Sequence, residues 1–146
     1  MPAFAKFFVA LIGLLCMALL AGQAWAEQKQ VLGEWDVHYI AFPSTMLTPQ
    51  IAQANGIVRS QYNSVINVSV LDSTSKQAQD VSVIGTATNL LGTKKPLSFK
   101  KVVEGEAIYY IATLKFANLE TYRFAIDIQN GNQLETLNFQ QKMYAE

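Results

Sequence analysis

The sequence is poor in the residues that most often carry reactive chemistry. Among 146 residues there is one cysteine, Cys16, and one histidine, His38. A single histidine excludes a multi-histidine metal centre. Cys16 lies near the start of the chain, and the remainder of the chain has no thiol that could act as a nucleophile, bind a metal as thiolate or form a redox pair. We therefore expect neither a metal nor another cofactor, and no catalytic residues are assigned.

An excess of charge of either sign is also missing. Eleven basic and eleven acidic side chains give a formal net charge of zero. A nucleic-acid partner requires a basic face, and the totals provide none, so we expect no nucleic acid. The clustered lysines at 94, 95, 100 and 101 are typical of a solvated turn and a strand edge.

The first residues have the organisation of an export signal. Lys6 precedes an apolar run over residues 7–20, and Ala24 and Ala26 then form the A-x-A pattern that signal peptidase cleaves. The pattern predicts a cleavable Sec-type signal peptide over residues 1–26.

Cleavage would leave one exported domain, residues 27–146, in the periplasm without Cys16 and without a membrane span. The apolar run is shorter than the roughly 20 residues that a spanning helix needs, which disfavours a retained anchor. Leu15 stands where lipoprotein processing prefers a small residue, which disfavours lipidation at Cys16.

The remainder of the chain is rich in β-branched and aromatic residues that alternate with polar ones. In residues 34–42, for example, Trp35, Val37 and Tyr39 would share one face, opposite Asp36 and His38. The same features predict strands over residues 34–42, 62–71, 81–90, 97–103, 107–116, 121–129 and 133–144. Seven short strands separated by turns predict an all-β fold, an immunoglobulin-like antiparallel β-sandwich.

The connection between the first two predicted strands, residues 43–60, interrupts this rhythm. Thr48 followed by Pro49 is typical of a helix start, and residues 55–56, Asn-Gly, are typical of a helix end. Two interpretations stay open: a lid whose Met46, Leu47 and Ile51 close one end of the sandwich, or a binding element.

Five segments carry a resemblance to a known family, residues 33–39, 56–60, 85–92, 107–112 and 139–144. Together they resemble domain-of-unknown-function family 4426, a group of uncharacterised exported proteins of Gram-negative bacteria. The resemblance covers the whole predicted mature chain. It implies a periplasmic all-β domain with a signal peptide, and it brings no reaction, substrate or catalytic residue.

The polar residues form no evident catalytic set. Asp36 and His38 would point to the same side of one strand, but no G-x-S-x-G motif supplies a nucleophile, so a polar surface pair is the favoured interpretation. Arg59 would either clamp an anion or pin the connection to the sandwich. Leu90 and Leu91 are adjacent, so one should point outward and could join Met46, Leu47 and Ile51 in an apolar patch.

These observations favour a non-enzymatic periplasmic interaction domain of unknown partner that uses the 43–60 connection as a contact surface. The candidate interaction surface is Met46, Leu47, Ile51, Arg59, Asn89, Leu90 and Leu91. The alternative is a small-ligand-binding periplasmic sandwich, with its pocket between the connection and one end of the fold. A hydrolase that uses His38 and Asp36 ranks third. The sequence leaves the oligomeric state open.

Overall fold

The computed structural model describes residues 27–145. The predicted signal peptide, residues 1–26, and Glu146 lie outside the described residues. The elements, in chain order, are β1 (Gln28–Leu32), β2 (Trp35–Pro43), η1 (Ser44–Met46), α2 (Pro49–Ala54), β3 (Asn63–Asp72), β4 (Ser82–Asn89), β5 (Lys94–Leu97), β6 (Lys100–Glu104), β7 (Ala107–Lys115), β8 (Thr121–Asn130) and β9 (Gln133–Lys142).

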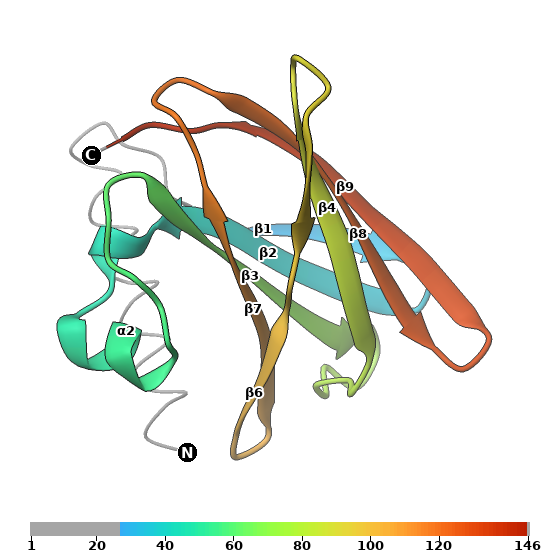
Figure 1. Ribbon diagram of the computed structural model, residues 1–146. Coiled ribbons are helices and arrows are strands. Elements are labelled where there is room, and N and C mark those ends of the chain that lie inside the picture. The colour runs from blue at the N-terminus through green and yellow to red at the C-terminus, as the bar shows by residue number, and fades with distance from the viewer. Residues whose placement is uncertain (1–26, 146) are drawn as a thin grey trace.

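The strands form two antiparallel sheets packed as a sandwich (Figure 1). One sheet has five strands in the order β1-β2-β3-β7-β6, and the other has four in the order β5-β4-β8-β9. Apart from β1, these orders are the A-B-E-D and C′-C-F-G arrangement of immunoglobulin-like sandwiches. The predicted fold class is therefore confirmed.

The strand number differs from the prediction, because the described residues form nine strands where seven were expected. The first addition is β1, a half-exposed edge strand whose polar sequence Gln-Lys-Gln-Val-Leu lacks a strong β signal. The second arises because residues 97–103 are not one strand. The chain leaves the four-stranded sheet after Leu97 and enters the five-stranded sheet at Lys100.

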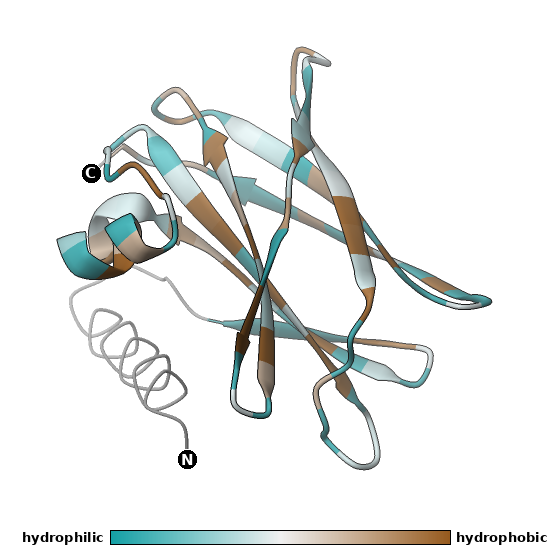
Figure 2. Ribbon diagram, turned by 60° about the horizontal axis from the view of Figure 1, so that its bottom comes forward, coloured by the Kyte–Doolittle hydropathy of each residue, from teal (hydrophilic) through white to brown (hydrophobic). Residues whose placement is uncertain are grey.

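The core lies between the two sheets and follows the predicted alternation. Trp35, Val37 and Tyr39 of β2 are buried there. They face residues of the opposite sheet, and the aromatic rings of Phe124 and Phe139 stack with their centroids 4.5 Å apart. Brown hydrophobic positions accordingly alternate with polar ones along the strands in Figure 2.

A second apolar cluster lies on the outer face of the five-stranded sheet. Ile40 and Phe42 of β2 and Val65 of β3 point outward and are covered by Leu47 and Ala52 from the 43–60 connection. The predicted helix is present: the Ile51 N–H donates to Thr48 Oγ1 (3.3 Å), and Pro49 is the first helical residue. The connection therefore covers a sheet face. It does not close an open end of the sandwich, as the lid interpretation expected.

Candidate functional site

The structure divides the predicted interaction surface into two separate groups. Met46, Leu47 and Ile51 belong to the cover on the outer face of the five-stranded sheet, where Leu47 is buried and the other two are partly buried. Leu90 and Leu91 lie in the turn after β4, far from α2 in both Figure 1 and Figure 2. The single apolar patch that the sequence suggested is not formed.

Arg59 stabilises the 43–60 connection through two hydrogen bonds. Its Nε donates to the Leu47 carbonyl (2.8 Å) and its Nη2 donates to the Thr45 carbonyl (3.2 Å). Both acceptors belong to the same connection, so the guanidinium fixes the path of the chain between β2 and α2. Arg59 therefore has a structural role, but it ties the connection to itself and not, as the pinning interpretation expected, to the sandwich.

Asn89, the third member of the second group, is buried and shapes the β4–β5 turn. Its Oδ1 accepts hydrogen bonds from the N–H groups of Leu91 (3.1 Å) and Thr93 (2.8 Å). These local side-chain bonds satisfy backbone donors that no strand partner reaches. Leu90 and Leu91 are held outward, with 66% and 93% of their surface exposed. Both leucines therefore face solvent, where the sequence predicted one.

A carboxylate joins this turn to the β7–β8 turn. The Asn89 amide donates to Glu120 Oε2 (3.0 Å), while the Ala117 N–H donates to Glu120 Oε1 (3.0 Å). Burial opposes ionisation of Glu120, but these hydrogen bonds outweigh it and hold the pKa of the carboxyl below its usual value. Glu120 thus acts as an ionised bridge between two turns that lie 31 residues apart in the chain.

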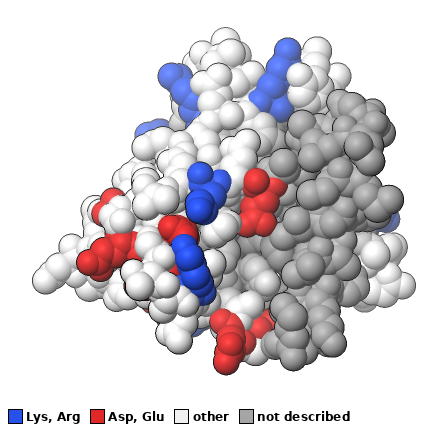
Figure 3. Space-filling model, turned by 180° about the vertical axis from the view of Figure 1, so that it is seen from behind, with Lys and Arg blue, Asp and Glu red and all other residues white. Residues whose placement is uncertain are grey.

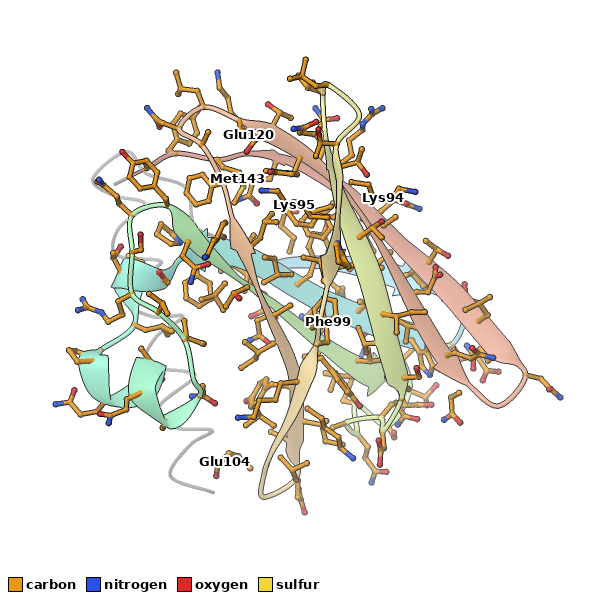
Figure 4. All side chains as sticks on the ribbon, viewed as in Figure 1. Lys94, Lys95, Phe99, Glu104, Glu120 and Met143 are labelled. Carbon is orange, nitrogen blue, oxygen red and sulfur yellow. The ribbon has the colours of Figure 1, made fainter. Side chains whose placement is uncertain are left out.

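A buried tyrosine, Tyr122, lies next to the Glu120 carboxylate. Burial and the neighbouring Glu120 carboxylate raise the pKa of the Tyr122 phenol. Lys95 Nζ lies 5.4 Å from the Tyr122 ring centroid and donates to the Lys115 carbonyl (2.8 Å). Figure 4 shows Lys95, Glu120 and Met143 near one another at this end of the sandwich.

The same end presents further apolar side chains that the sequence analysis did not single out. Leu119, in the β7–β8 turn, has a left-handed φ of 68° and 54% exposure. Tyr62 and Tyr144, which flank β3 and β9 here, are also exposed. In the sequence, Leu119 could have been recognised as an apolar residue between two predicted strands, 107–116 and 121–129. We call Leu90, Leu91 and Leu119 the leucine tips.

Charge is strongly divided between the two ends of the sandwich. The strand register places the following cations near the leucine tips, and we call this region the basic end: Lys94, Lys95, Lys115, Arg123 and Lys142. Among the described acidic residues, Glu120 alone belongs to the turns of this end. In Figure 3, blue side chains stand along the upper edge without red ones, while the red side chains lie lower, with further blue ones among them.

The opposite end carries more carboxylates than cations, although Lys76 and Lys101 lie there in ion pairs with Asp36 and Asp80. The register and loops place six carboxylates there, and we call it the acidic end: Glu34, Asp72, Asp80, Glu104, Glu106 and Glu135. Its three tight turns, residues 33–34, 105–106 and 131–132, contain only Gly, Glu and Asn. Exposed apolar side chains flank these turns, at Val31, Val103 and Leu134, but none lies within them. Turns that themselves contain leucine are found at the basic end.

Asp36 and His38 lie on the outer face of the five-stranded sheet, each with a different partner. Lys76 Nζ donates to Asp36 Oδ2 (2.6 Å), and this hydrogen bond lowers the pKa of the Asp36 carboxyl despite its burial. His38 Nδ1 lies 2.8 Å from Glu27 Oε1. Asp36 is buried beneath Lys76, so it is not the exposed surface group that the sequence predicted.

A pocket of about 140 Å³ lies where the connection meets β6 and β7. Gly56 and Ile57 line it on one side, and Ser98, Lys100 and Thr113 on the other. Elsewhere in residues 27–145, no three His, Cys, Asp or Glu side chains gather as a metal site would require. Over the same residues, no helix has the length and apolar character to cross a bilayer.

Comparison with known proteins gives a family and a fold. The family model described as "Domain of unknown function (DUF4426)" matches residues 29–146. A crystal structure of a DUF4426 family protein from Pseudomonas aeruginosa PAO1 is 36% identical, with a TM-score of 0.72 over 82% of this chain and 96% of that one. No curated protein matches the chain.

Two more distant structures share the fold. Both are of FetP from uropathogenic Escherichia coli and are 11% identical to this chain. One is a copper-bound variant, with a TM-score of 0.56 over 82% of this chain and 95% of FetP. The other is the protein as isolated after expression in the periplasm, with a TM-score of 0.54 over 80% and 91%. At this identity the likeness shows the fold alone.

Proposed function

The chain belongs to the DUF4426 family, whose function is unknown, and on that premise we propose that it is a non-enzymatic periplasmic interaction domain whose contact surface is the basic end. The predicted signal peptide supports the location. Fold similarity to a protein expressed in the periplasm is compatible with it.

One observation carries the choice of surface: the Asn89–Glu120 hydrogen bond, which joins the two turns that bear the leucine tips. Sandwich packing does not require leucine at these positions, since the turns of the acidic end are polar. Single exposed leucines are ordinary on protein surfaces, whereas apolar side chains gathered at one place mark interaction sites. Turns that are already fixed also lose less conformational entropy on binding.

The non-enzymatic part of the proposal rests on how the polar residues are engaged. Asp36 bonds to Lys76 and Ser73, and His38 pairs with Glu27. Asp36 is thus engaged away from His38. Glu27 does lie at Nδ1, as the carboxylate of a hydrolase triad does, but within residues 27–145 no serine or threonine hydroxyl is hydrogen-bonded to His38, so the nucleophile of a triad is not in place. Glu120, the most elaborately bonded carboxylate near the tips, accepts hydrogen bonds that join turns.

Site-specific photo-crosslinking in the exporting cell tests this proposal. A photoreactive residue replaces Leu91, and a matched probe replaces Ile84, which is 62% exposed on the outer face of the four-stranded sheet. We expect a discrete adduct, with protein or with lipid, from the Leu91 probe only. Equal adducts from both probes, or none from Leu91 in exported and folded protein, would refute the basic end as the contact surface.

The pocket beside the connection supports a second candidate function, binding of a small ligand. Its volume of about 140 Å³ is below the roughly 300–1,000 Å³ of drug-sized sites, so it suits a small molecule. A Thr113→Trp substitution would fill the pocket from an exposed strand position. Thermal stabilisation by a ligand that disappears in this variant would support the candidate, and unchanged stabilisation would assign the ligand elsewhere.

A further inference from the structure

We propose that the basic end docks on an anionic phospholipid surface: the leucine tips enter the interface while Lys94, Lys115 and Lys142 contact the phosphates. This inference rests on the proposed function and names the class of its partner. The inference follows from the arrangement at the basic end, where the apolar side chains lie at the turns and the lysines lie farther back along the strands.

Leu91, Leu119 and Tyr144 each have a lysine nearby in the chain, set back from the end of the fold along the adjoining strand. Lys94 comes three residues after Leu91, Lys115 four residues before Leu119, and Lys142 two residues before Tyr144. An extended chain advances roughly 3.3 Å per residue, so these lysines lie within about 13 Å of the tips along the chain. Interfacial segments place apolar groups roughly 5–10 Å deep, with cations at the level of the headgroups. The spacing agrees with that depth.

The tyrosines fit the same arrangement. Tyr62 and Tyr144 are exposed beside the tips, and tyrosine is enriched where membranes meet water, because its ring is apolar and its hydroxyl is polar. Lys142 Nζ lies 5.9 Å from the Tyr144 ring centroid. This pair can therefore present a cation and an aromatic ring to one interface.

The division of charge would orient the molecule on such a surface. A bilayer containing phosphatidylglycerol attracts clustered lysines, an effect worth about a fivefold change in affinity per residue near the surface. The same surface repels the carboxylates of the acidic end. A molecule with no formal net charge can thus bind an anionic membrane in one orientation, with the acidic end directed away.

The geometry favours a membrane over a protein partner. The leucines project from the ends of turns, with Leu91 93% exposed, and projecting apolar tips can enter a deformable lipid interface without a matching pocket. Leucine on a protein partner would instead require a complementary cavity. The Asn89–Glu120 bridge keeps the tips of both turns in place for simultaneous insertion.

Vesicle co-sedimentation of the exported protein, purified after removal of the predicted signal peptide, tests the inference. Phosphatidylcholine vesicles containing one quarter phosphatidylglycerol are compared with pure phosphatidylcholine, at low and at high salt. We expect binding to the anionic vesicles alone, weakened by salt because the charges lie at the surface. The double variants Leu90→Ser/Leu91→Ser and Lys94→Gln/Lys142→Gln should each weaken it about tenfold or more.

Matched controls keep the experiment specific. Ile84→Ser/Leu134→Ser removes two exposed apolar side chains elsewhere, and Lys29→Gln/Lys100→Gln removes equal charge away from the basic end. Both variants should bind as the parent does. All substituted side chains are exposed, and thermal melting verifies the fold of each variant. Absence of binding to anionic vesicles at low salt, or equal loss in the controls, would overturn the inference.

The two proposals fail in different ways. If vesicles are not bound while the Leu91 probe gives a discrete protein adduct in cells, the lipid inference is refuted and the interaction surface stands. If the probe gives no adduct of either kind and vesicles are not bound, both proposals are refuted.

Discussion

Asn89 is the residue on which the geometry of the basic end most depends. It is 8% exposed, and its amide group bonds to the backbone of Leu91 and Thr93 and to the Glu120 carboxylate. A polar side chain used in this way costs little to bury, because both its donor and its acceptor are satisfied. The turn and its leucines are therefore part of the folded structure.

We expect Asn89→Ala to lower the free energy of unfolding by about 1–3 kcal/mol, since it leaves backbone donors and one Glu120 oxygen without their partner. Urea denaturation measures the change. Asn132→Ala, in an exposed turn at the acidic end, is the matched control and should remain within about 0.5 kcal/mol of the parent. Equal stability of both variants would contradict the role assigned to Asn89.

Glu120 adds a dependence on pH. The folded state holds the pKa of its carboxyl below the ordinary 4.5, so the unfolded chain binds the proton more readily. The resulting stability is fully present above about pH 4.5 and is lost as pH falls through the folded pKa. The Glu120→Gln variant keeps the shape but removes this titration.

Parent and Glu120→Gln should therefore differ in stability at neutral pH and converge in acid, as measured by denaturation at a series of pH values. The lowered pKa values of Asp36 and Asp72 affect both proteins alike, so the difference isolates Glu120. A difference that stayed constant down to acid pH would show that Glu120 titrates as it does in the unfolded chain.

At the scale of elements, β4 packs closely against β8. A Cβ added at Gly85 would lie 2.9 Å from Ile126 Cγ1 and 3.0 Å from the Ala125 carbonyl oxygen. Both neighbours belong to the paired strand, so relief requires the sheet to shift. Gly85 is not among the glycines with a positive φ, so the lack of space, and not the backbone conformation, favours glycine here.

We expect Gly85→Ala to destabilise the fold by about 1–3 kcal/mol through overpacking. Ser82→Ala, exposed in the same strand, serves as the control and should change stability by less than about 0.5 kcal/mol. Thermal or urea unfolding gives both values, and an unchanged or raised stability of Gly85→Ala would show that the strands separate without cost.

The 43–60 connection contributes to stability through Leu47, which is buried in the outer apolar cluster. Leu47→Ala should cost about 2–5 kcal/mol, because it removes buried methyl groups and leaves a cavity. Val58→Ala, at a 69% exposed position of the same connection, should cost little. If Leu47→Ala were equally mild, the connection would not be a packed cover.

The elements that the sequence predicted well have a local signal, and those it missed do not. The Trp35–Val37–Tyr39 alternation specified the inner face of β2, and Thr48-Pro49 specified the start of α2. The local sequence does not indicate which surface a short helix covers. The lid interpretation, which placed the connection over an open end of the sandwich, was therefore wrong. The chain changes sheets between Leu97 and Lys100 without a glycine that would indicate a break, so the two strands were predicted as one. β1 was missed because its sequence is polar.

The candidate site was predictable to a similar extent. Leu90 and Leu91 were recognisable as adjacent apolar residues at the end of a strand, and Asn89 was included with them. The bridge from Asn89 to Glu120 spans 31 residues and depends on how β4 and β8 pair, which a pattern along the chain does not contain. The adjacent Tyr109 and Tyr110 show the same limit: alternation along a strand predicts that at most one of them is buried, yet both are.

At the scale of the whole molecule, the distribution of charge matters more than its sum. The formal net charge is zero, but cations gather around the leucine tips and carboxylates around the turns of the other end. Field effects of such a division act over about a Debye length, roughly 10 Å at moderate ionic strength. Each end therefore interacts with its surroundings as a surface of its own sign.

Ion-exchange chromatography at neutral pH and low salt makes this division measurable. We expect the protein to be retained on both cation and anion exchangers, because each resin can contact the end of opposite charge. Lys94→Gln/Lys142→Gln should elute earlier from the cation exchanger with little change on the anion exchanger. Glu104→Gln/Glu106→Gln should do the converse. If each double variant instead shifted elution equally on both resins, retention would follow net charge, and the two ends would not act as separate surfaces.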